Sequence, residues 1–291
     1  MVRWTLAALA LFFVPLAIWW LSLKPSNDRE WADEVSRTLR GSVRGSRVTL
    51  RDIRDFDWRS DTDYTARWHD GTYDLDELDS VDMALSYWMG PAIAHTLVSF
   101  GFTDGRHLVF SVEIRRERGE AFSSLGGFLK QFELAIVAAE ERDILHVRAG
   151  PRGEQVFLYP VHMPPQARRA LFLSYVERAN RLADEPRFYH SVTANCTTLV
   201  YDMVRPLVPG LPLDVRLILS GYLPEYLYSH GGLDTSLPLD TLRARADRID
   251  VADAKHPKVA ERHERRLERR AEHADRRADR LERRADTLQS R

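Results

Sequence analysis

Cysteine is almost absent from this sequence of 291 residues, in which Cys196 is the single example. One thiol excludes an internal disulfide and leaves the redox compartment open. It also excludes the structural zinc sites that use several thiolates, and no cluster of His, Cys, Asp and Glu has the spacing of zinc ligands. The sequence therefore predicts neither a metal site nor any other cofactor.

The sequence also has no large excess of charge of either sign. The 42 basic and 43 acidic residues give a net charge of −1. Residues 260–291 hold 11 Arg against 8 acidic residues, which leaves 31 basic and 35 acidic residues elsewhere. Neither part is basic enough to predict binding to nucleic acid. The Gly-x-Ser-x-Gly elbow, the phosphate loop and the dinucleotide fingerprint are missing too, so the sequence does not point to those enzyme classes.

What is present begins with an uncharged stretch at the N-terminus. Residues 4–23 carry no charge, and as a helix they would span about 30 Å, the thickness of a bilayer core. Tryptophans lie toward both of its ends, where interfacial aromatic residues belong. A cleaved signal peptide is the alternative, but it would need a small-residue cleavage site. The bulky residues 19–23 favour an uncleaved anchor, and Arg3 before the span favours a cytoplasmic N-terminus.

The rest of the chain divides into a stalk, a domain and a tail. Residues 25–45, after the anchor of residues 1–24, are expected to be a polar stalk, partly helical around 31–39. Residues 46–252 are expected to be a globular domain, in which Gly, Asp and Pro separate short strands from a long helix that opens at Pro164 and Pro165. The strands are expected at 48–50, 93–100, 107–114, 144–148 and 156–159, and the helix face consists of Leu171, Phe172, Tyr175, Val176, Ala179 and Leu182.

The tail, residues 253–291, has a pattern of its own. Apolar residues recur at spacings of four and three, as in a heptad repeat, and acid-before-base pairs at i,i+4 support a helix. Most of this stripe is alanine, so a solvated single helix is one interpretation. A self-pairing coiled coil, or a contact with another protein or with anionic lipid, is the other. The stripe consists of Leu267, Ala271, Ala274, Ala278, Leu281, Ala285 and Leu288.

The residues around Cys196 suggest that its thiol takes part in a reaction. The residues before it are loop-like, and the apolar residues from Cys196 to Val204 have the spacing of one helix face. Pro206 ends this helix at about the preceding residue. Cys196 is thus expected in the first turn, where unpaired N–H groups and the helix dipole lower the pKa of a thiol and make it a nucleophile. The alternative is that Cys196 is a small buried hydrophobic residue.

A nucleophilic thiol needs a base, and His95 is the candidate because it lies in an apolar strand that a hairpin turn follows. The alternative is that His95 is a structural residue of the core whose ring nitrogens are hydrogen-bonded there. A two-residue turn would place Glu113 of the return strand on the opposite face from His95. A three-residue loop with Gly105 in the left-handed conformation would pair His95 with Glu113. We take the second register as the hypothesis.

Four separated motifs carry a resemblance to a known family. They are Ala94-His95-Thr96, residues 110–120 (Phe-Ser-Val-Glu-Ile-Arg-Arg-Glu-Arg-Gly-Glu), residues 140–143 (Glu-Glu-Arg-Asp) and residues 189–198 (Tyr-His-Ser-Val-Thr-Ala-Asn-Cys-Thr-Thr). From about residue 46 to 210 the chain resembles the bacterial domain of unknown function labelled the Lnb N-terminal periplasmic domain. That family is similar to circularly permuted papain-like proteins of the NlpC and lecithin:retinol acyltransferase kind.

The resemblance implies a set of catalytic residues. Cys196 would be the nucleophile, and His95 would be the base. Ser111 or Glu113 would orient the base, and Asn195 would sit beside the nucleophile and help to hold an oxyanion.

We therefore expect an α+β, circularly permuted papain-like domain with an antiparallel sheet and packed helices. One transmembrane helix would anchor it to the bacterial inner membrane, with the bulk of the chain in the periplasm. The expected function is a thiol hydrolase or acyltransferase that acts on a cell-envelope amide, ester or thioester. The alternative is a non-catalytic binding or assembly module of the envelope. An enzyme would have an accessible thiol of low pKa near His95, whereas a binding module could bury Cys196.

Overall fold

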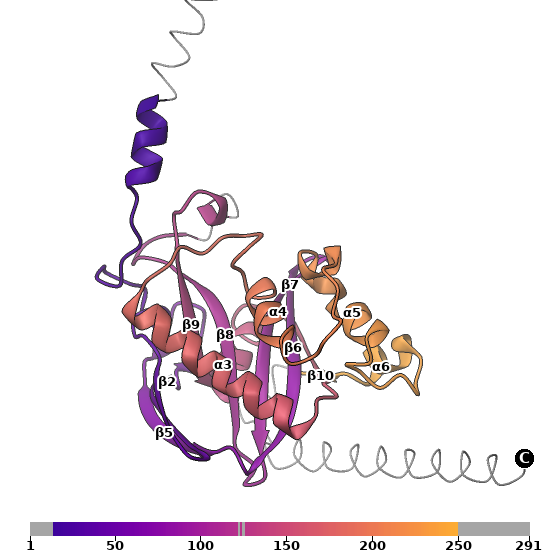
Figure 1. The fold of residues 1–291 in the computed structure, drawn as a ribbon. Helices are drawn as coiled ribbons and strands as arrows, with labels where there is room; N and C mark the ends of the chain where they lie inside the picture. Colours follow the sequence, from indigo (N-terminus) through magenta and orange to yellow (C-terminus); the bar gives the residue numbers. More distant parts are fainter. Residues whose placement is uncertain (1–13, 122, 124–125, 250–291) are drawn as a thin grey trace, which may run out of the picture.

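One large sheet forms the centre of the molecule (Figure 1). The computed structural model describes residues 14–121, 123 and 126–249. Within them, nine strands pair in the order β1-β2-β9-β8-β7-β6-β10-β11, with β5 on β2, and β3 pairs separately with β4. The β2–β9 pair is parallel and the other pairs are antiparallel. The strands are β1 (Arg40–Arg44), β2 (Arg47–Arg54), β3 (Asp57–Trp58), β4 (Tyr64–Thr65), β5 (Trp68–Asp74), β6 (Leu78–Met89), β7 (Ile93–Phe102), β8 (His107–Arg115), β9 (Glu133–Glu140), β10 (Gln155–Pro160) and β11 (Asp247–Arg248).

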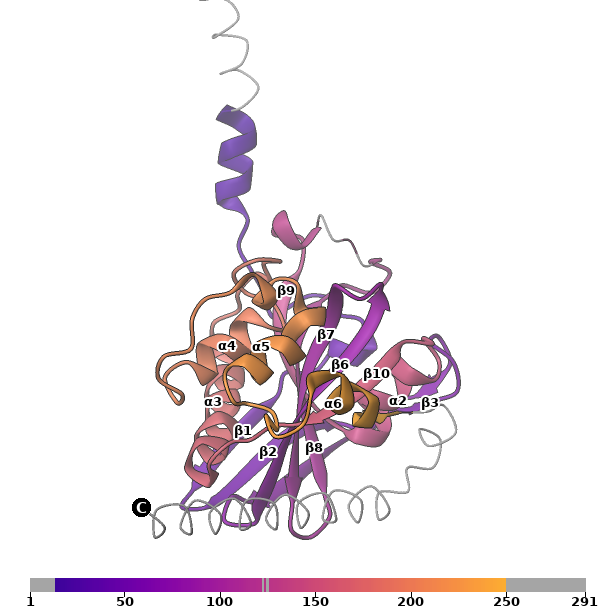
Figure 2. The same ribbon diagram turned by 90° about the vertical axis from the view of Figure 1, so that its right-hand side faces the viewer.

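Helices cover both faces of the sheet (Figures 1 and 2). Successive side chains of a strand point to opposite faces. Phe100 and Phe110 therefore pack against Phe172 of α3, whereas Leu97 packs with Ile144 of α2 in a second core. The helices are α2 (Glu141–Ala149), α3 (Pro165–Asp184), α4 (Thr198–Val204), α5 (Leu223–Ser229) and α6 (Leu239–Arg245), with short 3-10 turns η1 (Asp33–Val35), η2 (Gly126–Phe128), η3 (Val215–Leu217) and η4 (Ser220–Tyr222).

The long helix agrees with its sequence pattern. Helix α3 begins with Pro165 in its first turn, and the six residues predicted for its apolar face are its buried residues. The strands expected at 48–50, 93–100, 107–114 and 156–159 lie within β2, β7, β8 and β10. A period of 3.6 residues on α3 and alternation on β8 thus predicted these elements.

The strand expected at 144–148 is wrong, because these residues belong to α2. Eight of the nine residues of α2 are buried, including charged ones. A helix buried on all sides shows no amphipathic period, so its short apolar run cannot be told from a strand by pattern. With only two and a half turns, α2 is also too short for the sequence pattern to distinguish a helix from a strand.

The segment expected as a polar stalk is part of the folded domain. Trp31 and Leu39 are buried, and β1 is the edge strand next to β2. Arg115 holds this segment in place: its guanidinium donates to the carbonyls of Val35 and Ser36, both at 2.9 Å, and lies 4.5 Å from the centroid of the Trp31 ring. The acidic residues Asp33 and Glu34 of this segment are likewise paired with Arg118 and Arg116 of the domain.

The two ends of the chain are described only in part. Residues 14–22 form a helix that projects from the domain. In the part of the chain that the structure describes, no helix combines the length and the apolar character needed to cross a membrane. Residues 4–13 of the expected anchor, and the tail at 253–291, lie outside the described residues.

Candidate functional site

The candidate site lies at the edge of the sheet where β7 begins and β8 ends. The β7–β8 ladder runs from Leu97 opposite Ser111 to Gly101 opposite His107. The turn that joins the strands has three residues: Phe102 N–H donates to Arg106 O at 3.0 Å, and Gly105 has φ +87°. The predicted three-residue loop is therefore confirmed. If the pairing of β7 with β8 is continued to the edge of the sheet, His95 lies opposite Glu113.

The His95 ring is held by both candidate orienting residues. Its Nε2 lies 2.7 Å from Ser111 Oγ and 3.2 Å from Glu113 Oε1. Ser111 Oγ donates its one proton to Glu113 Oε1 at 2.7 Å, so it can only accept from His95. Nε2 therefore carries a proton, and Nδ1 is the ring nitrogen left for the thiol. Both residues that the sequence offered as partners of His95, Ser111 and Glu113, therefore lie within reach of its Nε2.

Arg148 of α2 completes this network and was not found from the sequence. Its Nη2 donates to Glu113 Oε1 at 2.8 Å, and its Nη1 lies 3.5 Å from Glu154 Oε2. Burial raises the pKa of the Glu113 carboxyl, but the charges of His95 and Arg148 and the hydrogen bonds from His95 and Ser111 hold that pKa well below its usual range. Glu113 is thus a fixed negative charge beside His95.

The third sequence motif explains why Arg148 is there. Asp143 of α2 accepts hydrogen bonds from Arg54, at 2.7 and 3.0 Å, from Phe56 N–H at 2.9 Å and from Trp58 Nε1 at 2.7 Å. Glu141 accepts from Ser99 Oγ of β7 at 2.7 Å. These buried carboxylates fasten α2 to the sheet, and α2 carries Arg148 to the site.

Cys196 enters the site from the start of α4. Leu199 N–H donates to Asn195 O at 3.1 Å, and the Asn195 side-chain oxygen accepts from the N–H groups of Thr197 and Thr198, both at 2.8 Å. Asn195 therefore caps the turn that leads into α4. Cys196 lies in this turn, two residues before α4 begins at Thr198, and not in the first turn of the helix as predicted. Asn195 Nδ2 donates to Ser191 O at 2.7 Å. Both ends of this amide are engaged in local structure, which does not favour the expected role of Asn195 at an oxyanion.

Cys196 and His95 interact as an acid and a base. Burial raises the pKa of the thiol. The charge and hydrogen bond of His95, the Thr96 N–H and the Thr197 hydroxyl lower this pKa by more than burial raises it, so the thiol pKa falls below its ordinary value. Burial and Arg148 lower the pKa of His95, but Glu113 and Cys196 raise it to about 9. The surroundings thus favour a thiolate–imidazolium pair. Cys196 and His95 are each only 9% exposed.

Two tyrosines near the thiol had been assigned no role from the sequence. The Tyr189 and Tyr175 hydroxyls both interact electrostatically with Cys196, and burial raises the pKa of each. Tyr175 lies on α3 and is fully buried, and in the described part of the chain its hydroxyl oxygen has no hydrogen-bond partner. The helix pattern correctly placed Tyr175 in the core, but no local signal shows that it faces a cysteine 21 residues away.

An apolar cavity of about 100 Å³ lies near the catalytic candidates, although neither His95 nor Cys196 is among its lining residues. Two of its lining residues, Thr96 and Thr197, directly follow His95 and Cys196 in the sequence, and their hydroxyls are 3.2 Å apart. The other side chains of the lining are apolar or aromatic and come from β6, β7, α3, α4, α5 and neighbouring loops; they include Val98, Leu171, Val200, Val204, Leu223 and Tyr226. The cavity therefore suits a hydrocarbon group and not a charged one.

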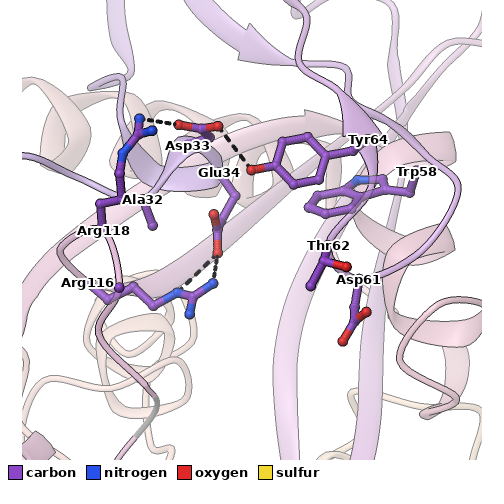
Figure 3. A pocket seen from close by; sticks show the side chains of 10 residues that line it. Ala32, Asp33, Glu34, Trp58, Asp61, Thr62, Tyr64, Arg116 and Arg118 are labelled. Atoms are coloured by element: carbon purple, nitrogen blue, oxygen red, sulfur yellow. Dashed lines mark hydrogen bonds and ion pairs between the residues drawn. The ribbon is translucent and has the colours of Figure 1, made fainter.

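A second cavity, of about 250 Å³, is polar and has a different character (Figure 3). Two acidic residues in its lining are paired with arginines: Arg118 donates to Asp33 at 2.8 Å, and Arg116 Nε donates to Glu34 at 3.1 Å. Tyr64 also donates to Asp33, at 3.0 Å. These ion pairs join the N-terminal segment to the residues after β8, and no cysteine or histidine lines the cavity. It is not a second site for thiol chemistry.

The comparisons with known proteins identify a family. Neither the curated proteins nor the solved structures contain a match to the chain. A family model, in contrast, matches residues 64–244, which is more than half of the chain. This match confirms the resemblance seen in the four motifs, and it includes His95, Ser111, Glu113, Arg148 and Cys196. The chain belongs to the family of the Lnb N-terminal periplasmic domain.

Proposed function

We propose that this protein is a periplasmic thiol hydrolase or acyltransferase, anchored to the bacterial inner membrane by residues 4–23, on a circularly permuted papain-like domain. The observation that carries the proposal is the connected set Cys196–His95–Glu113, with Ser111 and Arg148 bonded to the carboxylate. A cysteine next to a histidine that a third group orients is the arrangement that nucleophilic catalysis requires.

The reaction follows from these positions. Cys196 Sγ attacks a carbonyl carbon while its proton resides on His95, and the carbonyl electron pair moves to the oxygen. The leaving group takes the proton from His95 as its bond to the carbonyl carbon breaks, which leaves the acyl group as a thioester on Cys196. Water, or an alcohol or amine acceptor, then gives a proton to His95 and attacks the thioester, and the thiolate leaves. Hydrolysis and acyl transfer differ only in this second nucleophile.

The surroundings of the thiol restrict the oxyanion donor and the acyl group. The N–H groups of Thr197 and Thr198 are occupied by Asn195, so the backbone N–H of Cys196 is the candidate donor at this helix end. The apolar cavity beside Thr96 and Thr197 favours an amide, ester or thioester with an apolar acyl part.

A non-catalytic binding or assembly module is the second candidate, and the burial of Cys196 favours it. In that case the polar network would only stabilise the fold. Because Cys196 as a whole is only 9% exposed, its thiol must still become accessible to an electrophile if it is a nucleophile. Reactivity therefore separates the two candidates.

The deciding experiment is a pH series of iodoacetamide alkylation of Cys196 in the full chain, in detergent. We expect an apparent thiol pKa well below the free value of about 8.5, and a higher one in His95→Ala. His190→Ala is the matched control, since His190 is near Cys196 in the sequence but interacts with the backbone of its own turn. An inert thiol, or one indifferent to His95, would reject the enzyme and leave the binding module.

A further inference from the structure

Large apolar side chains that face solvent gather at one end of the domain. Outside the helix of residues 14–22, the described residues have such side chains in four segments, with Val43 on β1 as the exception. They are exposed by between 37% for Val192 and 78% for Leu213. We call this set the apolar rim: Trp88, Met89, Phe128, Leu129, Val192, Leu213, Val215 and Ile218.

Hydrogen bonds show that these segments meet in pairs. The β6–β7 turn, which carries Trp88 and Met89, is bonded to η4 through Gly221 N–H and Ala92 O at 3.0 Å. The η2 segment is bonded to the turn before Cys196 through Ser191 N–H and Gly127 O at 3.1 Å. Both pairs lie at the edge of the sheet where β6 and β8 end and β7 and β9 begin, which is also the edge of His95 and Glu113.

The N-terminal helix leaves the domain from the same end (Figures 1 and 2). Lys130, directly after Leu129 of the rim, donates to Trp20 O at 3.2 Å and lies 5.1 Å from the centroid of the Trp20 ring. The exposed side chains of this helix are also apolar, among them Leu16, Ile18 and Leu21. The helix continues the uncharged run of residues 4–23. The rim and the apolar run therefore lie at the same end of the domain.

We infer that the apolar rim docks on the lipid bilayer that holds the N-terminal helix. Exposed apolar side chains that gather at one end of a domain are costly in water and mark an interaction site. The bilayer is the partner because the chain itself brings this end of the domain to it, and because tryptophan and other apolar side chains insert to a depth of about 5–10 Å at a membrane interface. The rim includes Val192, four residues before Cys196, so docking places the thiol site beside molecules carried in the membrane.

This inference rests on the anchor of the proposed function but not on catalysis, and the test removes the nucleophile. In the full chain with Cys196→Ala, single cysteines are introduced as Met89→Cys, Phe128→Cys and Ile218→Cys and labelled with the fluorophore NBD. Ile18→Cys in the N-terminal helix is the positive control. Val43→Cys, on β1 and exposed by 48%, is the matched negative control. The protein is reconstituted in phosphatidylcholine vesicles with and without doxyl-labelled lipid.

We expect the three rim labels to shift their emission to the blue and to be quenched by doxyl lipid, as the label at position 18 is, while the label at position 43 stays aqueous. Rim labels that behave like position 43 while position 18 is in the membrane would overturn the inference and leave the rim to a protein partner. An aqueous label at position 18 would overturn the anchor and the docking together. Neither result depends on whether Cys196 is catalytic, since alkylation of the unmodified chain tests that separately.

Discussion

His95 and Glu113 face each other across the β7–β8 hairpin, with 3.2 Å between Nε2 and Oε1. The pairing depends on a loop of three residues that ends in Gly105, whose φ of +87° is a conformation that glycine adopts without strain. With a loop one residue shorter, every side chain of β8 would change face. The geometry of one turn therefore decides whether the histidine has a carboxylate partner.

Glu113→Gln is expected to lower the pKa of His95 and to raise that of Cys196, because it removes the charge that favours the imidazolium. The pKa of His95 is about 9 in the folded chain, against about 6.5 unfolded. The stabilisation from its charge is thus complete below pH about 6.5, and it is lost as the pH rises through about 9. The stability advantage of the wild type over Glu113→Gln should therefore shrink over this interval, as measured by urea unfolding. A constant advantage would contradict the assignment, and Ser111→Ala, which keeps the charge, is the control.

Asn195→Ala is expected to destabilise the protein by about 1 kcal/mol, because the N–H groups of Thr197 and Thr198 at the start of α4 lose their acceptor. Asn195→Asp keeps an acceptor but adds a negative charge beside the thiol, so it should raise the pKa of Cys196. Thermal unfolding and the alkylation profile measure the two effects separately. A wild-type alkylation profile in Asn195→Asp would show that Asn195 does not set the electrostatics of the thiol.

Asp143→Asn is expected to be strongly destabilising, by about 3 to 5 kcal/mol, since it leaves the buried Arg54 without its counter-charge. Glu177→Gln, which breaks the exposed pair with Arg181, should have no measurable effect in the same unfolding experiment. Equal stability of the two variants would argue against Asp143 as the fastening point of α2.

Tyr175→Phe is expected to stabilise the protein, by about 1 kcal/mol, because its buried hydroxyl lacks a hydrogen-bond partner. Tyr226→Phe is the matched control: its hydroxyl donates to Pro212 O at 2.9 Å, so its loss should cost about 1 kcal/mol. Denaturant unfolding compares both with the wild type. Destabilisation by Tyr175→Phe would mean that the hydroxyl is satisfied in solution.

Val98→Trp is expected to fill the apolar cavity and to reduce acylation of Cys196 by octanoyl thioesters more than acylation by acetyl thioesters. Val43→Trp, outside the cavity, should change neither. Intact-protein mass spectrometry measures the acylated fraction, and thermal unfolding shows whether Val98→Trp is folded. An equal loss for both chain lengths in a folded variant would show that the cavity does not receive the acyl group.

The sequence by itself determined the features that depend on neighbours along the chain. The apolar period of α3 named its buried face, and the polar run before α4 located Cys196 close to a helix start. The Thr-Asp-Gly sequence allowed two registers of β8, and the structure has the one that pairs His95 with Glu113. Each of these follows from local geometry: 3.6 residues per helical turn, two per strand repeat, and the φ of one glycine. The four motifs also identified the family.

Only the tertiary structure decided which distant side chains complete the site. Arg148 was hidden because α2 is buried on all sides and has no amphipathic pattern, and Tyr175 looked like any core residue of α3. The N-terminal segment read as a stalk because its acidic residues Asp33 and Glu34 find their partners more than 80 residues away, on Arg118 and Arg116 after β8. Burial and ion pairing of this kind arise from packing between elements, so no periodicity in the sequence records them.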